Sequence, residues 1–464
     1  MELQPENLLE PMLSESIYHF LVESQNGRTD FSELTSIFFR LIQTMTDPPL
    51  EFIWFYSALA FQTHSNSTNY SLLTNVKDLF HLLTSFRTPC FSKKVAILAP
   101  VLYHLFYSSS NDCKTEVQSL ADRIVSYLVM CCENSEVVEP EDEVGMSWVG
   151  VVPVWIAGQV RENCGRVDGL QLFLPMSSGR GVDGEFGMDR LAGVVMIEAF
   201  LFRLCLMFGS GASRVDLCRD VKSYAVQMVK GFKKNSNFLV TLFKLLLEPS
   251  LPVTELLTTT DELLLRRLLF DVASDLGSFL RSDAYSQLSD SKYKEIVTLW
   301  LFATNSALQF ASENDDQAGV KYYLNAFSAS QLPHQIIAWV TGVTSIKPTI
   351  PDISSPKDII GWLLVLEKQG LKICDYSISE LHEKTLKYKS MEIGNEITDC
   401  QTMVEDAPAK INCRRKRDST GFGEVQKHIK AMKCCHENLG DEVFCGRIEV
   451  GNSVPDQEMV DMVH

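Results

Sequence analysis

Three glycines at the spacing of a dinucleotide-binding loop are the first residues of this chain that could do chemistry. Gly179, Gly181 and Gly184 form a G-x-G-x-x-G, which in a nucleotide site permits a tight turn and close backbone approach to a pyrophosphate. The surrounding sequence does not fit that role, because no acidic residue ends a strand about 20 positions further on. We therefore interpret residues 177–187 as a Gly-rich loop. A nucleotide-binding enzyme that uses the glycine loop at 179–184 remains a remote alternative.

Cysteines and histidines gather near the C-terminus in a number that could bind zinc. They are Cys400, Cys413, His428, Cys434, Cys435, His436 and Cys445. Structural zinc usually requires paired ligands such as C-x2-C or H-x3-H, which hold one ion from a short turn, and this cluster has no such pair. We predict unpaired thiols here, with no metal and no cofactor; zinc binding is the alternative.

The short signatures of common enzyme classes are absent from the sequence. It has no G-x-S-x-G, no Gly-Lys-Ser/Thr P-loop and no H-E-x-x-H, and the pair His382-Glu383 lacks the second histidine. Other histidines, such as His81 and His104, lie within helical patterns, where a lone imidazole has no partner to make it a base. We predict no catalytic residues and a non-enzymatic function.

A basic tetrad lies on a polar segment near the C-terminus. It consists of Arg414, Arg415, Lys416 and Arg417. Such a run can act as a nuclear localisation signal or contact phosphates, and a solvated run of charge is the alternative. The tetrad predicts a location in the nucleus, the cytoplasm or both, and it allows weak contact between the tail and nucleic acid.

The overall charge and the cysteine content limit the class of protein. The chain has 42 Lys and Arg against 59 Asp and Glu, a net charge of −17, so we expect no direct nucleic-acid binding by the folded body. Several of the 13 cysteines, among them Cys131, Cys132 and Cys205, lie in apolar helical patterns. We predict that they are reduced thiols of the core.

The first third of the chain reads as a series of amphipathic helices. Apolar residues recur at three- and four-residue steps in two stretches: Phe31, Leu34, Ile37, Phe38, Leu41 and Ile42, and then Leu72, Leu73, Val76, Leu79, Phe80, Leu82 and Leu83. Pro49 and Pro89 punctuate this pattern and lie 40 positions apart, close to the length of one helical-hairpin repeat. The pattern predicts helices at 51–61, 70–86, 93–107 and 116–132.

Residues 1–132 resemble an α-solenoid of the armadillo/HEAT type. The resemblance concerns architecture only and identifies no single family. It implies an extended surface that binds other proteins, because stacked helical hairpins present long faces. Other proteins are therefore the partners we expect.

Three further regions follow this N-terminal helical-repeat segment. Residues 133–143 form an acidic linker, residues 144–390 a helical body, and residues 391–464 a disordered tail with few large apolar side chains. In the body, Ser355 and Pro356 have the types that begin a helix, and Gly370 the type that ends one. Body helices are predicted at 188–208, 214–232, 237–247, 261–281, 291–311, 320–328, 333–341 and 356–369.

One apolar stretch, residues 191–212, is long enough to cross a membrane. It contains Glu198 and Arg203, and a charged residue costs about 2.5–3.5 kcal/mol near the centre of a bilayer. We therefore predict a buried core helix. The sequence as a whole favours an all-α, helical-repeat stack that acts as a non-enzymatic scaffold or adaptor. A membrane-associated helical protein that uses 191–212 as an insert is the main alternative; membrane association is not expected.

Overall fold

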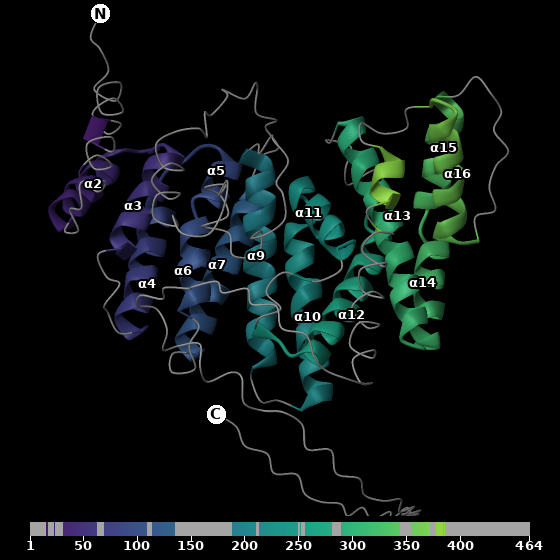
Figure 1. Ribbon diagram of the computed structural model, residues 1–464, viewed down its shortest axis with the longest axis horizontal. Helices are drawn as coiled ribbons and strands as arrows, with labels where there is room; N and C mark the ends of the chain where they lie inside the picture. The colour runs from purple at the N-terminus through teal and green to yellow at the C-terminus, as the bar shows by residue number, and fades with distance from the viewer. Residues whose placement is uncertain are drawn as a thin grey trace, which may run out of the picture. The chain divides into compact units, whose positions relative to one another are not determined.

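The computed structural model consists of helices and their connections wherever it describes the chain (Figure 1). It describes residues 31–62, 69–108, 114–134, 188–209, 213–248, 256–280, 289–343, 354–371 and 377–383, together with residues 15, 16, 23, 251 and 385. Of these residues, 84% are helical and none lies in a strand. The predicted all-α fold class is therefore confirmed for the described part of the chain.

Most of the helices bury one face and expose the other, as their apolar periodicity requires. In chain order they are α2 (Ser32–Thr44), α3 (Leu50–Gln62), α4 (Asn69–Ser85), α5 (Phe91–Ala96), α6 (Ala99–Tyr107), α7 (Lys114–Asn134), α9 (Met188–Phe208), α10 (Arg214–Phe232), α11 (Ser236–Leu246), α12 (Thr259–Leu276), α13 (Asp290–Glu313), α14 (Gln317–Ala329), α15 (Leu332–Val343) and α16 (Pro356–Lys368).

Helices that are close in the chain also pack against each other. In the first part, α2 packs on α3 and α4 on α6; further along, α9 packs on α11, α11 on α13, and α13 on both α14 and α16. Their buried side chains form one apolar cluster that extends from Phe31 to Ile378. Helix α9 has a central place in it, because it contacts α5, α6 and α7 as well as α10 and α11.

Helix α9 contains residues 191–208 of the apolar stretch 191–212 that is predicted as a core helix, and residues 210–212 lie outside the described residues. By length and composition it could cross a membrane, but 78% of its most apolar 18-residue window is buried among the other helices. Gly193 allows α11 to approach closely, since a Cβ there would lie 2.8 Å from both the Asn237 carbonyl oxygen and Thr241 Oγ1. The prediction of a core helix is confirmed by this burial.

Several helix boundaries agree with the sequence predictions. The predicted spans 188–208 and 214–232 match α9 and α10 at both ends. At α16, Ser355 is the N-cap and its Oγ accepts a hydrogen bond from the Asp358 amide at 3.3 Å. Gly370 follows the helix with φ of 86°, a left-handed conformation that a Cβ disfavours.

Two predictions in the N-terminal helices are wrong. The predicted helix 93–107 is two helices, α5 and α6, which are separated at Ile97 and Leu98. Pro100 explains the break, because proline lacks an N–H and its ring clashes with the carbonyl four residues earlier. Ile37, predicted on the buried face of α2, is 52% exposed, because adjacent helical residues point about 100° apart and Phe38 occupies the buried direction.

Candidate functional site

The site residues predicted from sequence lie outside the described residues. This applies to the glycine loop 179–184, the Cys/His cluster between 400 and 445 and the basic tetrad 414–417, as it does to the tail 391–464 and most of the linker 133–143. Among the described residues, no group of three or more His, Cys, Asp and Glu side chains is arranged to hold a metal ion. The candidate site therefore comes from the geometry of the helices.

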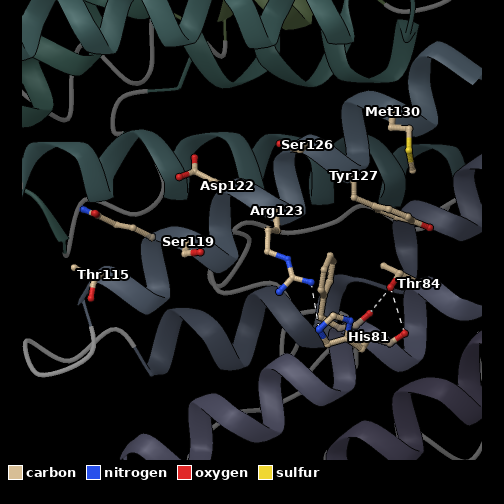
Figure 2. A pocket seen from close by; sticks show the side chains of 11 residues that line it. His81, Thr84, Thr115, Ser119, Asp122, Arg123, Ser126, Tyr127 and Met130 are labelled. Carbon is tan, nitrogen blue, oxygen red and sulfur yellow. Dashed lines mark hydrogen bonds between the residues drawn. The ribbon is translucent and has the colours of Figure 1, made fainter.

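An open groove of about 710 Å³ lies between α4 and α7 (Figure 2). Hydroxyl, amide, charged and apolar side chains all contribute to its surface. It is lined by Phe80, His81 and Thr84 of α4, and by Thr115, Gln118, Ser119, Asp122, Arg123, Ser126, Tyr127 and Met130 of α7.

The α7 wall of the groove follows from helix geometry. Thr115, Ser119, Asp122, Ser126 and Met130 recur at steps of three and four residues, so they share one face of the helix. Across the groove the two helices are bridged by rings: Phe80 and Tyr127 meet edge to face with centroids 6.2 Å apart. The groove thus has an apolar floor and a hydroxyl-rich wall.

Arg123 spans the groove from α7 towards α4. Its Nη2 donates a hydrogen bond to His81 Nε2 at 3.2 Å, and its guanidinium lies 5.6 Å from the centre of the Phe80 ring (Figure 2). Because a guanidinium can only donate, His81 accepts through Nε2, which places the imidazole proton on Nδ1. His81, which the sequence places within a helical pattern, is an exposed residue of α4. Its imidazole is hydrogen-bonded to Arg123.

Two residues that line the groove also fix α7 to α9. Asp122 Oδ1 accepts from Arg203 Nε at 2.5 Å, and the Arg203 guanidinium lies 5.3 Å from the centre of the Tyr224 ring. Gln118 Nε2 donates to the Leu206 carbonyl oxygen at 3.0 Å. These contacts hold the α7 wall of the groove in register with the core helix.

The titratable side chains along the groove are not activated for catalysis. Burial raises the pKa of the Tyr127 phenol and, next along the helix, that of the Cys131 thiol, so both keep their protons at neutral pH. Asp122 is engaged by Arg203. Thr115 donates to the Glu116 carboxylate at 2.9 Å, but hydrogen bonds from the Glu116 backbone amide and from Thr115 lower the pKa of Glu116, which makes this carboxylate a poorer general base.

The buried cysteines and His104 are packed within the helical core. The cysteines within the described residues, namely Cys90, Cys131, Cys132, Cys205 and Cys218, are free thiols. Cys131, Cys132 and Cys205 are buried, as predicted, and burial raises the pKa of Cys132 to about 12. His104 stacks on Phe61 with ring centroids 3.5 Å apart, and burial lowers its pKa to about 3, so its imidazole is neutral at pH 7.

A second polar cluster joins α10, α12 and α14. Asp271 accepts from Lys222 Nζ at 2.8 Å and from the Tyr323 hydroxyl at 3.0 Å, while the Tyr322 hydroxyl donates to Asp275 at 2.5 Å. Burial, and then the neighbouring carboxylates, raise the pKa of both tyrosines. Because each acceptor here is already bonded to a neighbouring helix, we assign this cluster to helix packing.

Sequence reasoning missed the groove between α4 and α7. A stripe of polar residues at helical spacing over 115–130 was the available signal, but any solvated helix face shows such a stripe.

Comparison with known proteins gives no relative for this chain. It matches no family model, no curated protein and no solved structure at a significant level.

Proposed function

We propose that this chain is a non-enzymatic scaffold or adaptor that binds segments of other proteins in the groove between α4 and α7. The observation that carries the proposal is the lining of this groove, which combines hydrogen-bonding side chains, an apolar floor and the half-exposed Met130 with no activated acid or base among the described residues. Such a surface suits recognition of a peptide segment.

The architecture supports the same function. Helices packed in chain order around one continuous core are what a helical repeat of the armadillo/HEAT kind requires, and we propose that the stack belongs to this class. From Thr115 to Met130 the groove wall spans 15 helical steps of α7, about 22 Å at 1.5 Å per residue. That length accommodates about seven residues of an extended partner.

The membrane alternative has less support. An insert at 191–212 would have to expose α9 to lipid, yet most of its apolar window is buried against other helices and Arg203 is paired with Asp122. The glycine loop at 179–184, on which the enzyme alternative rests, lies outside the described residues.

We expect a groove-filling variant to lose its protein partners. In proximity labelling in cells, the double variant Ser119→Arg with Ser126→Arg should deplete a defined set of labelled proteins by about tenfold, because bulky side chains at the centre of an interface remove its contacts. Both serines are exposed, so the fold should be unchanged. The matched control is Ser328→Arg, at an exposed position of α14. Equal labelling by both variants would contradict the proposal.

The basic tetrad supports a separate proposal on location. If it is an import signal, a fluorescent fusion carrying Arg415→Ala and Lys416→Ala should move from the nucleus to the cytoplasm, since two of its four positive charges are removed. Microscopy of live cells measures this shift. A wild-type fusion that is already cytoplasmic would leave the tetrad as a solvated run of charge.

A further inference from the structure

Arg123 differs from three arginines that hold neighbouring elements together. Those three pair with aspartates: Arg203 with Asp122, Arg214 with Asp261, and Arg267 with Asp316, at 2.5 to 2.8 Å. Among the described residues, Arg123 makes no ion pair, and its contacts are to neutral groups instead. A guanidinium keeps its charge at any physiological pH, so this charge stays available in the groove.

The Arg123 side chain is nevertheless held in a defined orientation. Its guanidinium packs over the Phe80 ring, and His81 Nε2 accepts a hydrogen bond from one of its five N–H groups. The remaining donors keep the planar, forked arrangement that matches a carboxylate. A side chain that is ordered before binding loses less conformational entropy when a ligand arrives, which favours recognition over non-specific attraction.

Nearby carboxylates do not neutralise Arg123. Asp122 is the only carboxylate among the described lining residues, and it is bonded to Arg203 on the side of α9. Glu116, at the start of α7, does not line the groove and accepts a hydrogen bond from Thr115 at 2.9 Å. The centre of the groove is therefore locally positive within a chain whose net charge is −17.

Other side chains of α7 offer contacts to a partner on either side of Arg123: two hydroxyls next to it and one apolar side chain further along the helix. Ser119 and Ser126 lie four residues before and three residues after it, about one helical turn away on either side, so each hydroxyl can donate a hydrogen bond to a partner group next to the one that Arg123 holds. Met130 is 49% exposed and lies two helical turns away, about 10 Å along the axis. Its flexible thioether adapts to a large apolar side chain.

We infer that Arg123 binds a carboxylate of the partner, so that the groove takes an acidic peptide segment whose carboxylate lies about 10 Å from a large apolar side chain seated on Met130. This spacing corresponds to three residues of an extended segment or seven of a helical one. The inference rests on the proposed function, because it names the chemistry of the partner in the same groove.

The test is selection from a phage-displayed library of random 12-residue peptides on the purified full chain, with counter-selection on the groove-filled double variant. The recovered peptides should be rich in Asp and Glu. Arg123→Gln should weaken their binding by about tenfold to a hundredfold, as loss of a charge-assisted hydrogen bond predicts, and Arg123→Lys should restore part of it. Binding should also weaken as salt rises. Arg219→Gln, at an exposed arginine of α10, is the control and should change nothing.

The outcomes separate this inference from the proposed function. Peptides that depend on the groove but carry no acidic residue, or that bind Arg123→Gln as well as the wild type, overturn the role of Arg123 and leave the groove as a binding site. Failure to recover any peptide that distinguishes the wild type from the groove-filled variant overturns both. Circular dichroism of Arg123→Gln should match the wild type, which excludes unfolding as the cause of lost binding.

Discussion

The Gly277→Ala variant should lose about 1–3 kcal/mol of unfolding free energy, because the added methyl group overpacks the core. A Cβ at position 277 would lie 2.5 Å from Trp300 Cζ2, and Trp300 is fully buried. The indole cannot move without loss of the hydrogen bond that its Nε1 donates to the Ala273 carbonyl oxygen at 3.2 Å. Gly277 has an ordinary helical φ of −54°, so the effect is steric rather than conformational.

Urea denaturation followed by circular dichroism measures this loss, and the chain offers a matched control. Gly361 also lies in a helix, α16, but a Cβ there meets no atom within 4 Å. Gly361→Ala should therefore stabilise the protein by about 1 kcal/mol, through helix propensity alone. If both variants shifted stability by the same amount and sign, Trp300 could not be packed against position 277 as described.

The Phe200→Ala variant should lose still more, about 3–5 kcal/mol, because it leaves a cavity at the centre of the stack. Phe200 of α9 is fully buried, and its ring meets that of Phe238 edge to face at 5.9 Å. Since α9 contacts helices on both sides of it, α5 and α11 should lose protection together. Hydrogen exchange in low urea measures this cooperativity, and Val365→Ala at an exposed position of α16 should change stability by less than about 0.5 kcal/mol.

The same variant separates the core-helix account from the membrane alternative. A lipid-facing α9 would tolerate Phe200→Ala with little loss, and the wild-type protein would stay in the membrane pellet after carbonate extraction. Burial in the helical stack predicts a large loss and release of the wild type into the supernatant. Pelleting of the wild type would contradict the account.

Much of the helical framework could be predicted from the sequence, because each helix carries its own signal. Apolar residues at 3.6-residue periodicity place α9 and α10, while Gly209 after α9 and the N-cap Ser213 before α10 mark the limit between them. The predictions failed where one residue acts against the pattern. Pro100 breaks an otherwise continuous apolar run, and Ile37 lies beside the buried stripe of α2 rather than on it.

The groove could not be predicted, because it depends on which helices become neighbours. Arg123 meets His81, 42 positions away in the chain, and Asp122 meets Arg203, 81 positions away. Nothing local distinguishes these charges from those of a solvated helix face. Only packing shows that Asp122 is paired while Arg123 remains oriented towards the groove.

Site-specific photo-crosslinking tests most directly whether the groove between α4 and α7 holds another protein. A benzophenone amino acid placed at Ser126, in the groove, or at Ser328, on an exposed face of α14, reports what lies within reach of each position in cells. Our account predicts discrete protein adducts from position 126 that are absent from position 328 and are lost when Ser119→Arg fills the groove. Identical adducts from both positions, or none from position 126, would contradict it.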